Sequence, residues 1–205
     1  MSVDKLFHPT NLPPAPMQRL VPELVTNAET RGVIDGVYDY VDTPIGTLFI
    51  GATPDGVARV GFEGESDPVA AFGADVGARV LPAADAKPTA GGAVEKVRQA
   101  SREIEEYFAG RRREFSVAVD VRLGGFRGQV VRALPTVGYG QRVSYKDLAH
   151  QVDNPGAVRA VGSACAHNPI PIILPCHRIV RSDGTWGRYR GGEQAKTYLL
   201  TMERG

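Results

Sequence analysis

The chain has 205 residues, of which 42% are hydrophobic and 23% charged, and its formal net charge is +1. These values are typical of a soluble globular protein with one large or two small cores, and no stretch approaches the roughly 20 apolar residues of a membrane-spanning helix. The first residues lack the apolar block of a secretory signal, so we expect a cytoplasmic protein. Two cysteines, Cys165 and Cys176, are too few for a disulfide scaffold, and with four scattered histidines they predict no metal site.

The small net charge conceals an uneven distribution. Up to Val121 the chain has 12 Lys and Arg against 18 Asp and Glu, whereas from Arg122 onward it has 12 against 5. An acidic half followed by a basic half indicates that the second half binds a polyanion such as nucleic acid. A chance distribution over a solvated surface is the alternative.

The first half begins without a periodic pattern and continues with strand signals. Residues 1–32 are rich in proline, which predicts an extended arm. Residues 36–63 contain short or alternating apolar runs separated by the turn sequences TPIG and TPDG, which predicts a three-stranded antiparallel meander. Residues 65–90, rich in Ala, Gly and Pro, favour no assignment.

A helix is predicted near the end of this half. Apolar residues recur at helical spacing over 94–108, and Gly110 is placed to stop the helix. Residues 114–121 are interpreted as a further strand or as a linker to the second half. Together these patterns predict an N-terminal α/β domain over 33–121, with an antiparallel sheet and a helix.

The second half, 122–205, has the pattern of an all-helical domain, so the predicted fold class is α+β. Apolar residues repeat at helical spacing over 126–134, and Pro135 closes that segment. The last stretch, 192–205, is an amphipathic helix by the same criterion.

Two short helices between these segments form a predicted helix-turn-helix unit. The first spans 144–152, starts at Ser144 and has Asp147 in the position that completes a capping box. The second is predicted to begin at Pro155, with Asn154 as its cap. Such a pair separated by the tight connection DNPG is found in DNA-binding proteins and also in helical hairpins that never contact DNA.

Residues 175–180, with the sequence PCHRIV, place Cys176 directly before His177. A thiolate is the softest protein nucleophile, and a neighbouring imidazole or cation raises the thiolate fraction of a cysteine. Prolines before Cys176 restrict the backbone and would hold a nucleophile in one place. For the Cys–His pair taken alone, a buried and inert cysteine is the alternative.

The sequence around Cys176 resembles the O6-alkylguanine-DNA alkyltransferase family. The string NPIPIILPCHRIVRSDGTWGRYRGG carries the family's PCHR signature and aliphatic pair, and SYKDLAHQVDNPGAVRAVGSACAHNP carries its DNA-reading helix. The resemblance is strong over 124–205, weaker in motifs over 36–120 and absent from the first thirty or so residues. It implies a ribonuclease-H-like N-terminal domain and direct reversal of DNA damage. The implied reaction is irreversible, stoichiometric transfer of an alkyl group from O6-alkylguanine, and less directly from O4-alkylthymine, to a cysteine without a cofactor.

The resemblance also implies catalytic roles for individual residues. Cys176 would accept the alkyl group, and His177 would remove the thiol proton through a water molecule. Glu203 would orient His177, and Asn168 would tie the helix-turn-helix unit to the active-site turn. Tyr145 would donate a proton or hydrogen bond to the departing guanine, which should not leave as a bare anion.

A second implied set of residues contacts DNA. Arg159 would enter the duplex through the minor groove and fill the gap left by the flipped base, which partly offsets the cost of unstacking. Small residues on the same helix would allow close approach to DNA. With Tyr145, the implied DNA contacts are Arg159, Ala160, Gly162 and Ser163.

The implied substrate pocket lies around and after the active-site turn. Its expected lining comprises Pro171, Trp186, Tyr189, Arg190 and Gly191. Trp186 and Arg188 depart from the family, which has smaller residues there, so substrate size or DNA affinity could differ. Vertebrate members bind zinc in the N-terminal domain, but this half has no cysteine, so no such site is expected.

The expected partner is double-stranded DNA containing O6-alkylguanine, bound by a monomer, with cooperative binding on DNA left open and no membrane involved. A sensor of alkylated DNA without repair activity and a transcription regulator are the alternatives. Sensors of this kind replace the acceptor cysteine, which Cys176 argues against. A cysteine hydrolase would need an oxyanion hole that no segment suggests.

Overall fold

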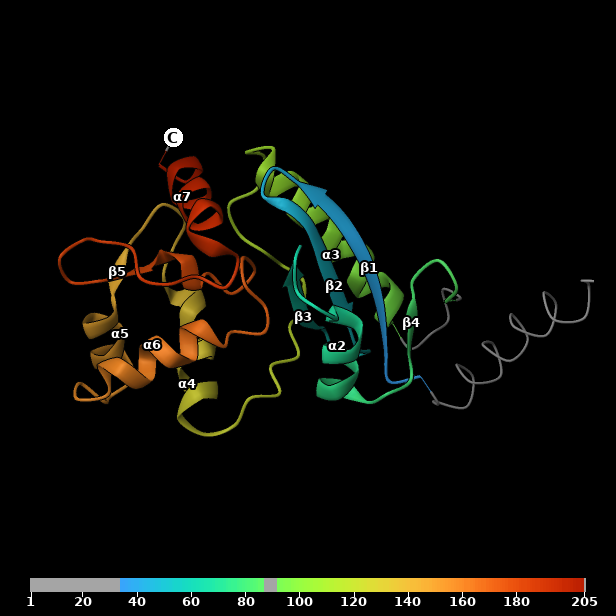
Figure 1. The fold of residues 1–205 in the computed structure, drawn as a ribbon, viewed down its shortest axis with the longest axis horizontal. Coiled ribbons are helices and arrows are strands. Elements are labelled where there is room, and N and C mark those ends of the chain that lie inside the picture. Colours follow the sequence, from blue (N-terminus) through green and yellow to red (C-terminus); the bar gives the residue numbers. More distant parts are fainter. Residues whose placement is uncertain (1–33, 87–91, 205) are drawn as a thin grey trace, which may run out of the picture.

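The computed structural model describes residues 34–86 and 92–204, so the predicted arm over 1–32 lies outside the described residues. Within these two ranges, the first half of the chain forms a sheet with two helices. The second half forms a group of helices beside it (Figure 1). No helix in the described part combines the length and apolar character needed to cross a bilayer.

The predicted three-stranded meander is confirmed. Strands β1 (Gly36–Thr43), β2 (Gly46–Ala52) and β3 (Val57–Phe62) pair antiparallel in chain order. The sheet is nevertheless mixed, because β4 (Val80–Pro82) pairs with β1 in parallel. Residues 65–90 contain β4 and also α2 (Pro68–Val76), neither of which was predicted. A three-residue strand is too short to leave a recognisable period in the sequence.

The sheet is covered on both faces. In β2, Leu48 and Ile50 belong to the core cluster that includes residues of α3 (Ala93–Phe108), whereas Phe49 turns to the opposite face and contacts Phe72 of α2. Alternate residues of a strand point to opposite faces, so a strand buried on both sides is apolar throughout. The predicted helix over 94–108 corresponds to α3, and it ends before Gly110, whose φ is +70°.

The segment 114–121 is a linker rather than a strand. It makes one isolated bridge to the sheet, between Val119 and Val57, where Val57 N donates to Ala118 O and Asp120 N donates to Val57 O, each at 2.8 Å. The linker is therefore attached to β3 as it crosses to the second half.

Glu103 of α3 fixes the start of this linker. Its carboxylate is buried and accepts hydrogen bonds from the Ser116 hydroxyl, from Ser116 N at 2.8 Å and from Val117 N at 3.2 Å. Gln99 Nε2 donates to it from the preceding helical turn at 2.9 Å. Burial acts to raise the pKa of Glu103, but these hydrogen bonds outweigh burial and lower it, so the group is an anion at neutral pH.

The second half has four α-helices within the described residues. The capping box of α5 is confirmed, with Asp147 N donating to Ser144 Oγ and the Asp147 carboxylate accepting from Ser144 N. These helices are α4 (Gly125–Ala133), α5 (Tyr145–Gln151), α6 (Val158–Ala166) and α7 (Gly192–Met202).

Two predictions for this half were wrong in detail. Helix α6 begins at Val158 rather than Pro155, because Asn154 uses its carbonyl to accept from Ala157 N in a turn instead of capping a helix. The half is also not purely helical, since β5 (Val143–Ser144) and β6 (Ile179–Val180) form a short parallel pair. That pair joins the start of α5 to the segment after Cys176.

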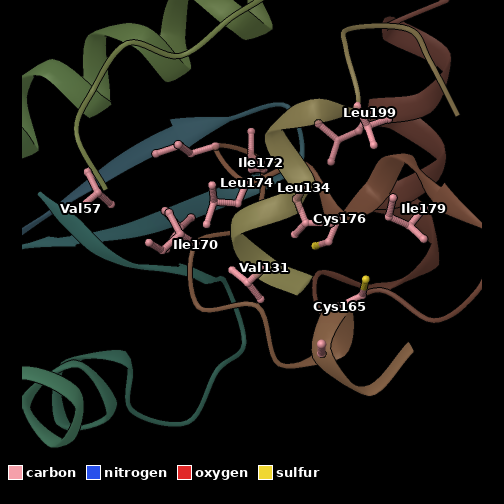
Figure 2. Packing of buried hydrophobic residues seen from close by; sticks show 14 of the residues in the cluster. Val57, Val131, Leu134, Cys165, Ile170, Ile172, Leu174, Cys176, Ile179 and Leu199 are labelled. Carbon is pink, nitrogen blue, oxygen red and sulfur yellow. The ribbon is translucent and has the colours of Figure 1, made fainter. Parts of the chain in front are cut away.

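One hydrophobic cluster extends through both halves. It includes Val57 and Val60 of β3, Val131 of α4 and Leu199 of α7, together with Cys176 (Figure 2). Because apolar burial is the dominant stabilising term in folding, the two halves stabilise one another.

The Glu103 cluster yields a prediction about stability. Replacing Glu103 with alanine leaves the buried amide of Val117 and the part-buried amide of Ser116 without this acceptor, and an unsatisfied buried donor costs about 1–3 kcal/mol. We expect the free energy of unfolding, measured by urea denaturation at pH 7, to fall by about 3 kcal/mol. The loss should shrink as the pH falls below the ordinary carboxyl pKa of 4.5, because the folded-state pKa is lowered and protonation removes the contribution.

A matched control is Glu95→Ala on the same helix, which removes an exposed carboxylate paired with Arg102. Its effect should stay within about 0.5 kcal/mol. Equal losses for the two variants would show that Glu103 does not hold the linker.

Candidate active site

Cys176 opens a single 3₁₀ turn, η2 (Cys176–Arg178), which we call the acceptor turn after the role that the sequence resemblance predicts for Cys176. The turn lies between the proline-containing loop and β6, and Cys176 is only 3% exposed. Figure 2 shows its side chain among buried aliphatic residues, in the same cluster as Cys165. The acceptor sulfur is therefore almost fully shielded from water in this structure.

Asn168 shapes the loop before the acceptor turn. Its side-chain Nδ2 donates to Leu174 O at 2.8 Å, and its Oδ1 accepts from Ile170 N at 3.0 Å. The loop so closed contains Ile172 with a φ of +74°, a conformation that is strained for a β-branched residue. The Asn168 hydrogen bonds join the end of α6 to the residues immediately before Cys176.

His177 is completely buried and directed at Glu203, with Nε2 3.2 Å from Oε1. A carboxylate can only accept, so the proton of the neutral imidazole lies on Nε2 and Nδ1 is bare. Nδ1 is buried and has no hydrogen-bond partner among the described residues. Burial lowers the pKa of His177 more than Glu203 raises it, so the ring is neutral at pH 7 and can accept a proton.

Glu203 is the meeting point of several elements. It accepts from Arg178 Nη2 at 2.8 Å, from the Tyr107 hydroxyl of α3 at 2.7 Å and from Gly140 N at 3.1 Å, in addition to His177. Burial alone would raise the pKa of this carboxyl, but the hydrogen bonds, led by those from His177 and Arg178, lower it well below its ordinary value. Arg178, predicted to brace the turn, also donates to Val137 O at 2.6 Å.

The environment of the Cys176 sulfur opposes ionisation. Burial raises the pKa of the thiol, and the Asn168 side chain and the Lys196 ammonium act in the opposite direction without overcoming it. The thiol is therefore protonated at rest and needs a base before it can act as a nucleophile.

Lys196 is a buried residue that sequence reasoning missed. Only 1% of it is exposed, and its Nζ donates to Ile179 O at 2.7 Å. A lysine on an amphipathic helix is ordinarily solvated, and nothing in the local sequence distinguishes this one. The Lys196 ammonium acts to lower the pKa values of both cysteine thiols, although burial outweighs it.

Tyr145 begins α5 and lies against residues of two other segments. A Cβ atom built on Gly187 would lie 2.3 Å from its hydroxyl, and one on Gly162 would lie 4.0 Å from its ring. Burial, followed by the nearby thiols of Cys165 and Cys176, raises the pKa of Tyr145 to about 12. The phenol therefore stays protonated at neutral pH and can donate a hydrogen bond.

The segment after the acceptor turn returns toward this site. The ring of Tyr189 stands edge-on to His177 with centroids 6.3 Å apart, and its hydroxyl is buried without a hydrogen-bond partner in the described part of the chain. Trp186 is partly exposed, and Pro171 is buried in an isolated bridge with Leu174. We call residues 186–191 the pocket wall, after the substrate pocket that the sequence resemblance predicts there.

Arg190, expected in the pocket lining, directs its guanidinium to Glu65 of the first half, with contacts of 2.8 and 2.9 Å. Its neighbour Gly191 packs against Phe62, at the end of β3. These contacts join the pocket wall to the sheet across 125 residues of sequence, which no local pattern could have revealed.

The predicted DNA-contacting residues lie on one side of α6. Arg159, Ala160 and Ser163 are exposed and Gly162 is partly exposed, whereas Val161 is buried. The helix thus presents small side chains and one long cation outward.

Comparison with known proteins finds that each half of the chain matches a domain of the same protein family. Residues 37–121 match the family profile "6-O-methylguanine DNA methyltransferase, ribonuclease-like domain", and residues 125–205 match "6-O-methylguanine DNA methyltransferase, DNA binding domain".

Individual relatives agree with the profiles. The methylated-DNA–protein-cysteine methyltransferase of Mycolicibacterium paratuberculosis is 45% identical over 102 residues, which cover 50% of this chain and 62% of that protein. The constitutive methyltransferase of that name from Bacillus subtilis is 33% identical over 172 residues, covering 82% of this chain and 94% of the relative.

Solved structures give the same result. The Mycobacterium tuberculosis O6-methylguanine methyltransferase superposes with a TM-score of 0.68 at 35% identity, covering 82% of this chain and 93% of that one. The Mycobacterium tuberculosis OGT in complex with DNA superposes with a TM-score of 0.69 at 33% identity, covering 82% and 92%. With both halves matched and a relative aligned over almost its full length, the chain belongs to the O6-alkylguanine-DNA alkyltransferase family, also named 6-O-methylguanine DNA methyltransferases.

Proposed function

We propose that this protein repairs DNA by transferring an alkyl group from O6 of guanine to Cys176, once per molecule. One observation carries the proposal. His177, which directly follows Cys176 in the chain, has a bare and buried Nδ1, and the thiol of Cys176 is buried and protonated. The opposite nitrogen is held by a carboxylate that stays ionised. This is the arrangement of a general base with an orienting group.

The proposed reaction balances as a single displacement. The thiol proton passes to Nδ1 of His177 through a water molecule, and the sulfur attacks the alkyl carbon. The carbon–oxygen bond to guanine breaks as the carbon–sulfur bond forms. Tyr145, protonated at neutral pH, donates a hydrogen bond to the departing base and limits its negative charge. The guanine anion then takes up, through solvent, the proton that His177 received, so the products are neutral guanine and the thioether. The thioether product is stable, so each molecule reacts once, and no cofactor is needed.

The substrate base has to leave the DNA duplex, because O6 is inside the helix and the sulfur is inside the protein. We propose that α5 and α6 act as a helix-turn-helix unit on the minor groove, with the exposed Arg159 filling the gap. The small outward residues of α6 permit the close approach to DNA that this requires. The partner is double-stranded DNA containing O6-alkylguanine, bound by a monomer of a cytoplasmic protein, with O4-alkylthymine as a secondary substrate.

The remaining roles belong to the same proposal. The domains are proposed to run over 33–121, with the ribonuclease-H-like fold of the family, and over 122–205. Asn168 positions the acceptor turn, and the pocket wall with Pro171 encloses the flipped base. The partly exposed Trp186 is at the rim, where its size would influence which adducts enter.

The first test identifies the acceptor. After incubation with duplex DNA containing O6-methylguanine, intact-mass measurement should show a gain of one methylene on the wild-type chain, located at Cys176 by peptide analysis. Cys176→Ser should show no gain. Cys165→Ser, which alters the other buried cysteine of the same cluster, should still be methylated. Full transfer to the Cys176→Ser variant would refute the assignment.

The second test uses pH. Because burial lowers the pKa of His177 below 6.5, its basic form should persist to lower pH than in an ordinary histidine. The first-order transfer rate at saturating DNA should therefore keep more than half of its pH 7.5 value at pH 6.5, and fall only in more acidic buffer. DNA affinity measured at each pH serves as the control. A midpoint above 6.5 would exclude His177 as a buried base.

The third test concerns base flipping. Arg159→Ala should weaken binding to duplex DNA and slow repair in the duplex by about tenfold, equivalent to roughly 1.4 kcal/mol. Reaction with free O6-benzylguanine should change much less, because no base has to be extruded. Arg98→Ala, which removes an exposed arginine from α3, controls for net charge. Equal losses on both substrates would contradict a role for Arg159 in extrusion.

A further inference from the structure

The end of β3 supports the active site from two directions. Val60 N donates to Pro169 O at 2.8 Å, in the loop before the acceptor turn. Phe62 packs edge-on against Tyr189 with ring centroids 5.5 Å apart, and a Cβ built on Gly191 would lie 2.5 Å from the Phe62 ring. The last strand of the meander therefore contacts the segments on both sides of the acceptor turn.

A bidentate ion pair closes this contact. Arg190 Nε and Nη2 donate to Glu65 Oε1 and Oε2 at 2.9 and 2.8 Å, and the two side chains are 22% and 21% exposed. Arg190 Nη1 also reaches Asn168 O at 3.4 Å. Glu65 is itself held in place by Phe62 N, which donates to Oε1 at 3.2 Å, and by Arg59 3.5 Å from Oε2. Bidentate geometry of this kind fixes orientation as well as distance.

The pocket wall that Arg190 anchors contacts the two groups expected to move protons. Gly187 lies against the Tyr145 hydroxyl, and Tyr189 stands beside the ring of His177. A shift of the wall would move the donor and the base relative to the acceptor sulfur. Displacements of about 1 Å can slow an enzymatic step by roughly a hundredfold, so the anchoring of this wall matters for the rate.

We propose that Glu65 and Arg190 form an interdomain clasp that positions the pocket wall for alkyl transfer. They are positioning residues, because they act through Tyr189 and Gly187 rather than on the reacting atoms. The inference rests on the proposed role of Cys176 and assigns to the first half a direct part in the rate of transfer.

The stoichiometric reaction allows positioning to be separated from folding. With full-length protein and saturating duplex containing O6-methylguanine, the final extent of Cys176 methylation counts the competent molecules, and the first-order rate reports the transfer step. We expect Glu65→Ala and Arg190→Ala each to lower this rate about fivefold at full extent. The double variant should be no more than about twofold slower than the slower single variant, since both changes break one contact.

The sign of the Glu65→Ala effect distinguishes positioning from simple electrostatics. If Arg190 acted only through its charge on the thiol, removing its carboxylate partner would favour the thiolate and speed transfer. Arg190→Lys keeps the positive charge but cannot make the second hydrogen bond to Glu65. We expect this variant to be methylated completely but at a lower first-order rate. It therefore tests positioning even if the alanine variants reduce the final extent of methylation.

Glu95→Gln removes an exposed carboxylate on α3 and should leave the rate unchanged. Affinity for undamaged duplex should also stay within about twofold of wild type in Glu65→Ala. An unchanged or faster rate in Glu65→Ala, a multiplicative loss in the double variant or an unimpaired Arg190→Lys would each overturn the clasp. Absence of methylation in the wild-type chain would instead refute the proposed function itself.

Discussion

The buried carboxylate of Glu203 is the group on which the active site depends. It comes from the end of α7 and collects donors from the acceptor turn, from α3 and from the backbone at Gly140. A buried charge is tolerated only when it is paired and hydrogen-bonded, so each donor is constrained to remain where it is. One ion therefore fixes the orientation of His177 and also joins the two halves of the molecule through Tyr107.

The same burial that stabilises this arrangement keeps the Cys176 thiol protonated. Cys176 lies in the main hydrophobic cluster, and burial raises the pKa of its thiol. Burial also lowers the pKa of the adjacent His177, whose ring is held by Glu203 and is neutral at neutral pH. Desolvation thus favours the neutral form of both side chains, which is the protonated thiol of Cys176 and the unprotonated imidazole of His177.

The sheet half is an integral part of the site rather than an attached module. Its strand β3 shares the core with the helices, receives the linker and contacts the segments before and after the acceptor turn. A surface loop is mobile unless something rigid supports it. Here residues 186–191 are supported by the buried strand β3 and by the ion pair of Glu65 and Arg190.

Features with a local physical cause could be predicted from the sequence. Alternating apolar residues between turn signals indicated the meander, helical spacing indicated α3, and Ser144 with Asp147 indicated the start of α5. The Cys–His pair alone left a buried and inert cysteine open, and the resemblance of the surrounding motifs to the alkyltransferase family carried the prediction that Cys176 is an acceptor and His177 a base. Such signals come from residues close together in the sequence, so they can be recognised without knowledge of the fold.

Other features depended on residues far apart in the sequence. The parallel strand β4, the burial of Lys196 and the attachment of Arg190 to Glu65 became apparent only from the structure. An ion pair or a short strand has no preferred residue pattern of its own, because its partner is supplied by packing of the whole chain. The sequence by itself determined which atoms could react, and the tertiary structure decided which groups hold them, since burial and long-range contacts set both position and pKa.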